Sequence, residues 1–353
     1  MSESTPALPT TFDAEHPQQV WIIMPPRHRW WLHIGLLLVT FLTTTLVGAH
    51  MQTNFSNHLP VFDIDEDLGA LVTFFGAALA QPSLLSRGLP FSFTLMLILL
   101  AHEMGHYLFA RHYHVYATLP YFIPFPSLIG TMGAFIRIKS PIPSRDALFD
   151  IGIAGPIAGF IPACAAVVWG LLLSQPLPPG SAASSNPLGF LPLIFHLAAS
   201  VFAIHTPLNQ LLLHPVAAAG WVGMFATALN LLPGGQLDGG HIVYSVFPKL
   251  HRWISLATML ALIPLAKYFW VGWLVWAVVL WITSYHPSVP GRTGLSGSRR
   301  MTALLGVVML AMALTPQPFK GGSGREVWAD IRESSRDTIH AVRDHFRQRL
   351  HHK

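Results

Sequence analysis

The longest stretch of this chain without a charged side chain constrains its fold more than any other feature. Residues Ile151–Leu237 are 87 consecutive residues without Asp, Glu, Lys or Arg. A helix that spans a bilayer needs about 20 mostly apolar residues, so this stretch alone is long enough for three spans. Over the whole chain, 10% of residues are charged, against roughly 25% in a typical soluble domain. The sequence therefore predicts an all-α polytopic membrane protein embedded in a lipid bilayer.

Apolar runs recur along the chain and give its expected membrane segments. The longer runs are expected to cross the bilayer and cover residues 30–49, 89–110, 149–173 and 215–232. Shorter runs occupy 253–266, 269–284 and 301–315, and the 13 residues 68–80 suit an interfacial helix better than a span. Residues 189–213 are apolar but broken by two prolines, so their state stays open. The total is about six to eight membrane segments.

Two histidines four residues apart lie at the end of the second expected span, in the sequence His102-Glu103-x-x-His106. On a helix their imidazoles project from one face and can bind one Zn²⁺. Glu103 is the only acid between Asp67 and Asp146, and it lies in an apolar helix where an unpaired carboxylate is costly. The motif predicts a zinc site at which Glu103 acts as a base toward water.

A catalytic zinc normally has a third protein ligand and one position open to water. Among residues 68–319 the remaining acids are Asp146, Asp150 and Asp238, and several lone histidines are further candidates. Asp238 follows the helix-breaking residues 233–235 at membrane depth, where irregular backbone is tolerated if it lines a wet cavity. Asp238 is therefore a plausible third ligand. His241 is a weaker candidate, for the metal or for its surroundings.

Three motifs together resemble the site-2 protease family of intramembrane zinc metalloproteases. The matching residues are His102-Glu103-x-x-His106-x-x-x-Ala110, Gly155-x-x-x-Gly159 and Asn230-x-x-Pro233-x-x-x-x-Asp238-Gly239. The resemblance covers roughly residues 88–245. It implies that His102, His106 and Asp238 bind zinc and that Glu103 activates water. It also implies that Asn230 supports the substrate backbone.

The same resemblance implies a substrate and a reaction. The substrate is expected to be a transmembrane protein whose helix must first be unwound, cleaved in regulated intramembrane proteolysis by a zinc metalloendopeptidase. Many bacterial relatives carry a PDZ domain between the second and third core spans. Residues 111–149 are too few for one, so the chain resembles a PDZ-less type.

The segment 121–144 allows two interpretations. Residues 130–139 alternate apolar and polar side chains near their end, as a strand would, but a cytoplasmic loop is an equal alternative. The family resemblance favours a membrane-associated β-hairpin beside the metal. The edge of such a hairpin could add an unfolded substrate segment as a further strand through main-chain hydrogen bonds. Gly133 and Phe135 are then expected to contact the substrate.

A membrane metal-ion transporter is the alternative function, because His and acidic residues on spanning helices also mark ion pathways. Glu103 separates the two hypotheses: a transporter would use it as a ligand, whereas a protease keeps it off the metal. A haem-binding protein is a weaker third hypothesis. Two histidines four apart on one helix lie on the same side and do not bracket a macrocycle.

The sequence divides into five expected parts. These are a cytoplasmic N-terminal segment (1–29), a first span with an interfacial segment (30–87), a catalytic metalloprotease membrane core (88–248), C-terminal spans (249–315) and a charged amphipathic tail (316–353). Arg27 and Arg29 precede the first span, whereas residues 50–86 contain no Lys or Arg, which predicts a cytoplasmic N-terminus. A multi-pass protein of a bacterial cytoplasmic membrane is expected.

Two classes of feature are not expected. The chain has no basic block interleaved with aromatic residues, so a nucleic-acid partner is not predicted. Cys164 is the single cysteine, which excludes a disulfide within the chain and a metal site built from cysteines.

Overall fold

A computed structural model describes residues 29–62, 68–178, 188–291, 296–320, 322–333 and 336. Within these residues, three helices are long and apolar enough to cross a membrane: α1 (Trp30–Ser56), α4 (Leu89–His112) and α5 (Arg145–Leu173). They coincide with three of the expected spans. The observed architecture is mostly helical, which confirms the predicted all-α polytopic class. The expected cytoplasmic segment, the acidic cluster at 63–67 and most of the tail lie outside the described residues.

The remaining helices are shorter. They are α2 (Leu68–Ala80), α3 (Pro82–Ser86), α6 (Leu193–Val201), α7 (Pro215–Asn230), α8 (Asp238–Val246), α9 (His251–Tyr268), α10 (Trp273–Ile282) and α11 (Gly297–Ala313). The stretch 189–213, left open by the sequence, contains α6, a 3-10 turn and the short strand β4 (Leu211–Leu212), which pairs with β3 (Gln175–Pro176). Its two prolines lie at the boundaries: Pro192 precedes α6 and Pro207 precedes the 3-10 turn.

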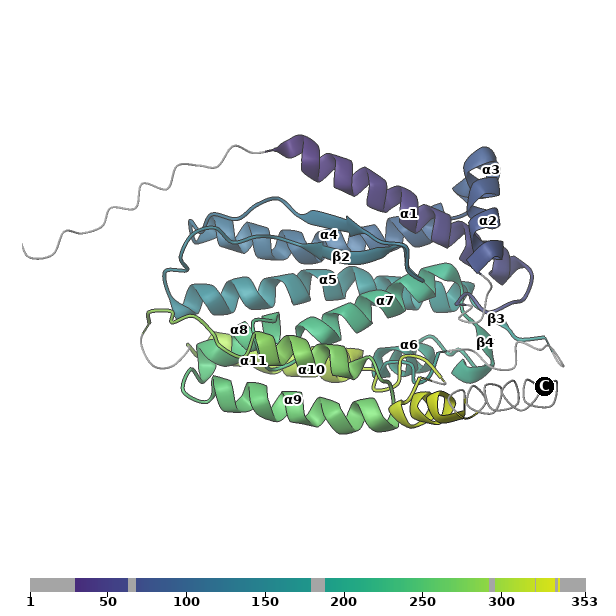
Figure 1. The fold of residues 1–353 in the computed structure, drawn as a ribbon. Helices are drawn as coiled ribbons and strands as arrows, with labels where there is room; N and C mark the ends of the chain where they lie inside the picture. Colours follow the sequence, from purple (N-terminus) through teal and green to yellow (C-terminus); the bar gives the residue numbers. More distant parts are fainter. Residues whose placement is uncertain are drawn as a thin grey trace, which may run out of the picture.

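Helix α5 runs through the centre of the molecule, between α4 on one side and α7 on the other (Figure 1). It begins four residues before the expected span because Ser144 caps it, accepting a hydrogen bond from the amide of Ala147. Its first turn is polar, so hydropathy alone places the start too late.

Small residues let α7 approach α5 closely. A Cβ added at Gly170 would lie 2.2 Å from the amide nitrogen of Ala217, and one at Gly220 would lie 2.9 Å from that of Val167. Lipid tails are as apolar as the helices themselves, so van der Waals contact at such close approach, rather than the hydrophobic effect, stabilises helix pairs in a membrane. Most of α7 is buried, including Trp221 and Met224.

The segment 121–144 forms the β-hairpin that the resemblance favoured, and the alternative of a plain loop is wrong. Strand β1 (Tyr121–Pro124) pairs antiparallel with β2 (Thr131–Phe135), with Phe122 opposite Ala134. The hairpin lies along α1, where the Thr43 hydroxyl donates to the Gly130 carbonyl at 2.7 Å.

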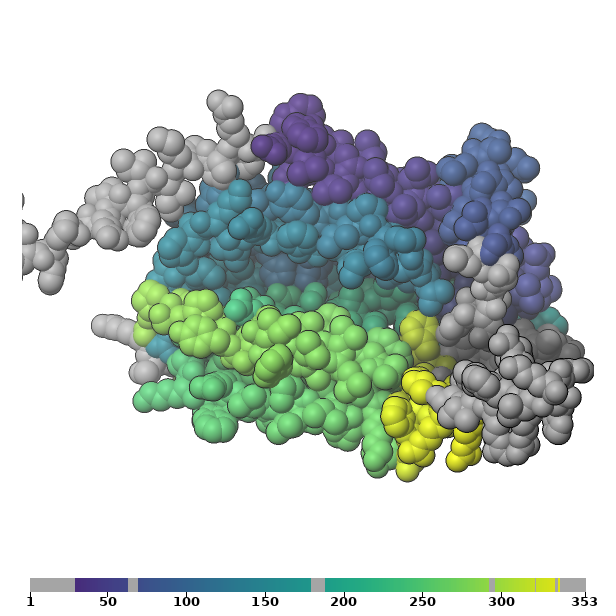
Figure 2. Space-filling view, viewed as in Figure 1, coloured from purple at the N-terminus to yellow at the C-terminus, as the bar shows by residue number. Residues whose placement is uncertain are grey.

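The hairpin region is accessible from one side. On the face shown in Figure 2, its blue-teal atoms and the green atoms of the helices after α7 form two bands with a hollow between them. The hairpin is therefore not covered by the later helices on this face.

Candidate metal centre

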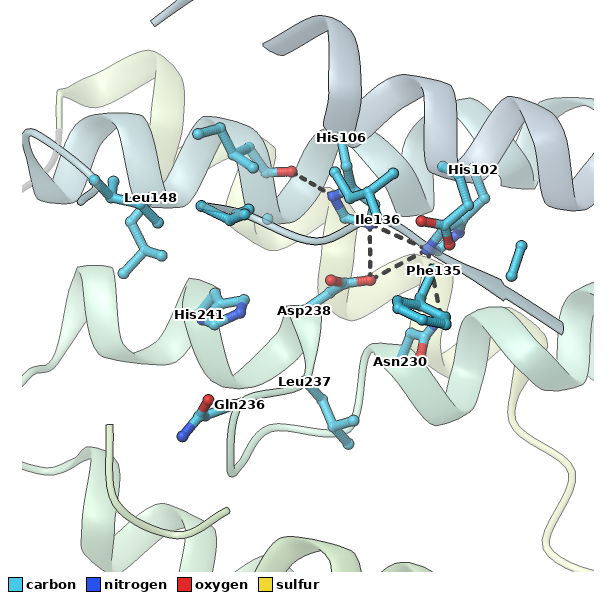
Figure 3. Close-up of a pocket in the computed structure, with 16 residues that line it drawn as sticks. His102, His106, Phe135, Ile136, Leu148, Asn230, Gln236, Leu237, Asp238 and His241 are labelled. Carbon is cyan, nitrogen blue, oxygen red and sulfur yellow. Dashed lines mark hydrogen bonds and ion pairs between the residues drawn. The ribbon is translucent and has the colours of Figure 1, made fainter. Parts of the chain in front are cut away.

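The two histidines of the motif lie one turn apart on α4 and face the same side. Both are buried, with 7% of each residue exposed. Their Nε2 atoms are 3.2 Å apart, and each lies 3.3 Å from the Oδ2 atom of Asp238 (Figure 3). The structure therefore brings together the three residues that the sequence predicted as metal ligands.

The spacing of these atoms fits zinc. Donor atoms that each lie about 2.0–2.1 Å from one tetrahedral Zn²⁺ are about 3.4 Å from one another. The three observed separations are 3.2, 3.3 and 3.3 Å. Two imidazole nitrogens and one carboxylate oxygen also form a donor set typical of catalytic zinc sites. Among the described residues, these three side chains form a group whose donor atoms lie close enough together to bind one metal ion.

Asp238 reaches the histidines because the chain bends sharply after α7. Asp238 is the first residue of α8, where the free N–H groups of a helix start stabilise a negative charge. The glycines that follow it allow the bend: a Cβ at Gly239 would lie 2.3 Å from the Leu231 carbonyl, and one at Gly240 would lie 2.3 Å from the Gly235 carbonyl. Gly239 and Gly240 therefore let the chain fold back closely, so that Asp238 lies beside the two histidines.

The orientation of His106 is fixed by the backbone of α5. Its Nδ1 atom lies 2.7 Å from the carbonyl oxygen of Ile151. Because a carbonyl oxygen only accepts, Nδ1 carries the proton and Nε2 is left with a lone pair for a metal. This tautomer is the one that the proposed ligand role requires.

Helix α5 packs tightly behind both imidazoles through the glycines of the Gly155-x-x-x-Gly159 motif. A Cβ added at Gly155 would lie 2.0 Å from His106 Nε2, and one at Gly159 would lie 2.9 Å from His102 Cβ. On the other side of the contact, a Cβ at Gly105 would lie 2.5 Å from the Ala154 carbonyl. The motif therefore leaves room for the side chains of His102 and His106.

Glu103 is buried on the wall of the same cavity, with 7% of the residue exposed. It does not belong to the trio of converging donors. The backbone of Ile136, just after β2, lies close to its carboxyl group. Glu103 thus lies beside the metal-binding atoms without being one of them.

A cavity of about 260 Å³ extends from these residues toward the hairpin. Ala134, Phe135 and Ile136 line it from the hairpin, and Leu237 and His241 line it from the start of α8 (Figure 3). The cavity therefore connects His102, His106 and Asp238 with the hairpin.

The three residues expected to contact substrate are placed differently. Asn230, the last residue of α7, lines the cavity, and its Nδ2 atom lies 3.3 Å from His102 Nε2. Phe135 also lines the cavity. Gly133 is in the same strand but not among the lining residues. Its amide donates to the Thr131 hydroxyl at 2.9 Å, and a Cβ added there would meet nothing within 4 Å.

The other two aspartates considered as third ligands are held elsewhere by Arg299 of α11. The Arg299 guanidinium binds Asp150 through Nε at 2.9 Å and Nη2 at 2.7 Å, and Asp146 through Nη1 at 3.1 Å. The Tyr113 hydroxyl donates to Asp150 and accepts from Arg299 Nη2 at 3.2 Å. These contacts join α4, α5 and α11 and exclude Asp146 and Asp150 from the metal site.

Sequence reasoning missed three contributors to this arrangement. The Ile151 carbonyl is a backbone group and has no sequence signature. Arg299 acts across 149 residues from Asp150, and His286 lies 2.9 Å from His241 although it is 45 residues away. A lone arginine at a span boundary and a lone histidine in a loop carry no signal for such pairings.

Comparison with known proteins agrees with this geometry. The sequence model of Peptidase family M50 matches residues 90–269, just over half of the chain. The chain is 32% identical over 254 residues to "Probable zinc metalloprotease EGY1, chloroplastic" of Arabidopsis thaliana, an alignment that covers 69% of this chain and 44% of that protein. It is 28% identical over 247 residues to "Probable zinc metalloprotease EGY2, chloroplastic" of the same plant, covering 67% and 43%.

The alignments cover only part of each related protein. The chain spans less than half the length of these two relatives. No solved structure matches it. The family match includes His102, His106 and Asp238, the three residues that converge in the structure. The chain therefore belongs to peptidase family M50, the family of the site-2 proteases, as its motifs indicated.

Proposed function

We propose that this chain is an intramembrane zinc metalloendopeptidase that cleaves membrane-spanning proteins in regulated intramembrane proteolysis. One observation carries the proposal: three donor atoms converge at zinc spacing while a buried carboxylate, Glu103, lies beside them and outside the donor set. This is the arrangement that separates a hydrolase from a transporter, which would use the glutamate as a ligand. No relative in the comparisons supports the transporter alternative.

His102, His106 and Asp238 would hold the metal, and the chemistry divides between it and the chain. Zinc, when bound, supplies a Lewis acid that polarises the scissile carbonyl and lowers the pKa of water. Glu103 takes a proton from the attacking water as its oxygen bonds to the carbonyl carbon. As the carbon–nitrogen bond breaks, Glu103 returns that proton to the leaving amine. Burial of Glu103 keeps bulk water away from the carboxylate during the transfer.

The hairpin would present the substrate to these groups. Amides within a helix are hydrogen-bonded and shielded, so the substrate must first unwind into an extended segment. Such a segment can pair with the edge of β2 through main-chain hydrogen bonds that ignore side-chain identity. Phe135 and Asn230 then flank the bound segment. The open space beside Gly133 leaves room for the substrate backbone along the strand.

The surroundings of the enzyme follow from its helices. The three long apolar helices make this an integral membrane protein. We also propose that the chain has the five parts given above, with residues 88–248 as the catalytic core, and that its N-terminus is cytoplasmic. From the sequence, we propose a bacterial cytoplasmic membrane as its location. The names of the related plant proteins give a chloroplast location for those proteins.

The purified protein, reconstituted in lipid, provides the test. Glu103→Gln keeps the size of the side chain but cannot accept a proton, so zinc content should equal that of the wild type. Cleavage of a single-span substrate should fall by at least about 10²-fold, the usual scale for loss of a general base. The matched control is Glu333→Gln, which changes an exposed glutamate and should cleave normally. Loss of zinc from Glu103→Gln would make Glu103 a ligand and contradict the proposal.

A further inference from the structure

His241 faces the catalytic cavity from α8, three residues after Asp238, and has no role in the mechanism above. It lines the cavity together with Leu237 and lies beside Asp238 in Figure 3. Its Nδ1 atom is 2.9 Å from the Nε2 atom of His286, which follows α10. A second histidine, which is not among the residues that line the cavity, therefore contacts the first.

The direction of this hydrogen bond follows from its neighbours. The Nδ1 atom of His286 lies 2.7 Å from the carbonyl oxygen of Pro287. A carbonyl oxygen only accepts, so Nδ1 of His286 carries the proton, and in the neutral ring its Nε2 must accept. Burial lowers the pKa of His286, which favours the neutral ring. His241 therefore donates through Nδ1, and its Nε2 is left as an acceptor.

Aromatic packing fixes the His286 ring in this position. The ring stacks on Tyr244, with centroids 4.0 Å apart and planes 14° from parallel. It meets His251 edge to face at 5.4 Å. His251 in turn donates through Nε2 to the carbonyl of Gly235 at 3.0 Å, in the turn that leads to Asp238. The His286 ring therefore packs against a residue that is hydrogen-bonded to the turn before Asp238.

An extended substrate would need an acceptor at this place. A peptide paired with the edge of β2 directs alternate N–H and C=O groups toward β2 and the others away from it. In Figure 3 the hairpin strand passes along one side of the cavity and His241 of α8 lies on the other, so the groups that point away from β2 face α8. A main-chain N–H removed from water without a partner costs free energy, and little water is available at membrane depth.

We propose that His241, held by His286, accepts through Nε2 a hydrogen bond from a main-chain N–H of the substrate. The inference rests on the proposed endopeptidase function and adds a second anchor to the β2 edge. Because the anchor binds main chain, it leaves the choice of substrate side chains open. His241 touches substrate, whereas His286 is a positioning residue that acts through His241.

Two amide variants distinguish the roles of the two nitrogen atoms of His241. His241→Asn places an amide near the Nδ1 position, where it can still donate to His286, but offers nothing at Nε2. His241→Gln places an amide oxygen near the Nε2 position, facing the cavity. We expect kcat/KM to fall about 10-fold in His241→Asn, the scale of one lost hydrogen bond to a buried amide. His241→Gln should stay within about 3-fold of the wild type, and zinc content should be unchanged in both.

His286→Phe tests the positioning role, because phenylalanine keeps the stack on Tyr244 and removes the Nε2 acceptor. We expect it to raise KM with little change in kcat and in zinc content. The matched control is His205→Asn, which changes an exposed histidine outside the cavity and should behave as the wild type.

A binding measurement provides a readout independent of cleavage. In the Glu103→Gln background, affinity for an uncleaved single-span substrate in lipid nanodiscs should fall about 10-fold with His241→Asn and recover with His241→Gln. Equal kcat/KM and equal binding in His241→Asn and wild type would overturn only the role of His241. Zinc loss in His241→Asn would overturn it too, by placing His241 in the metal site. A wild-type protein that holds zinc and cleaves nothing would overturn the endopeptidase function itself.

Discussion

The Nδ1 atom of His106 lies 2.7 Å from the carbonyl oxygen of Ile151, and this hydrogen bond joins α4 to α5 at the metal site. Ile151 follows Asp150, whose carboxylate is held by Arg299 of α11. The backbone group that holds the His106 imidazole is therefore next in sequence to a side chain that is bound by a third helix.

The tight fit between α5 and the histidines predicts the effect of one added methyl group. In Gly155→Ala, the new Cβ would occupy a point 2.0 Å from His106 Nε2, so the imidazole must move out of the metal site. We expect zinc affinity to fall roughly 10- to 100-fold, the range seen when the surroundings of a ligand are altered. Zinc titration with a competing chelator measures this.

The control for this substitution is Gly35→Ala on α1, where an added Cβ meets nothing within 4 Å. It makes the same chemical change in another spanning helix and should leave zinc affinity unchanged. Wild-type zinc affinity in Gly155→Ala would show that α5 can move away from α4 at little cost.

The identity of the third ligand can be tested among the three aspartates. Asp238→Ala should lose both zinc and cleavage, because two imidazoles from one helix supply only part of the coordination that a catalytic zinc needs. Asp146→Ala is the matched control: its carboxylate pairs with Arg299, so zinc should remain. Elemental analysis of the purified variants measures their zinc content. A wild-type zinc content in Asp238→Ala would show that Asp238 is not a zinc ligand.

The hairpin is expected to act through its backbone. Ile136→Pro removes the amide hydrogen of the residue just after β2, whose backbone lies close to Glu103. Cleavage should drop by at least about 10-fold while zinc stays bound, since none of the three metal ligands is changed. Ile136→Ala keeps the amide and removes only the side chain, so it should cleave more like the wild type. Equal rates in Ile136→Pro and Ile136→Ala would mean that the strand edge does not orient substrate.

The cluster around Arg299 predicts a coupling between α11 and the core. In Arg299→Met, Asp150 loses its cationic partner while largely shielded from water, with 18% of its side chain exposed. We expect the free energy of unfolding to fall by about 1–3 kcal/mol, visible as a lower melting temperature in detergent. Arg300→Met changes the exposed neighbour and serves as the control. A melting temperature equal to that of Arg300→Met would show that α11 does not stabilise α5 through this pair.

Sequence alone predicted the parts of the site that are local or belong to a motif. The spacing of His102 and His106 places both imidazoles on one helix face, and the structure has them there. The broken helix before Asp238 indicated a ligand at membrane depth, and the structure brings that residue to the histidines. These predictions depend on short stretches of chain whose geometry is set by helix periodicity and by proline and glycine.

The remainder depends on tertiary packing that no periodicity encodes. The pattern in residues 130–139 left a loop and a hairpin equally open, because pairing of β2 requires β1 and a surface on α1. The start of α5 was placed too late because its first turn contains Arg145 and Asp146, and hydropathy registers neither the Ser144 cap nor the contact between Asp146 and Arg299. The distant contacts of His241 and Ile151 likewise exist only after the helices have assembled.

The Arg299–Asp150 pair has a consequence for the order of events during synthesis. The two residues are 149 positions apart, and α11 is inserted long after the histidines and Asp238 have entered the membrane. Until Arg299 emerges from the ribosome, Asp150 has no guanidinium partner, and the turn of α5 that orients His106 is less firmly held. We therefore expect the nascent chain to contain His102, His106 and Asp238 well before it contains the Arg299 side chain that pairs with Asp150.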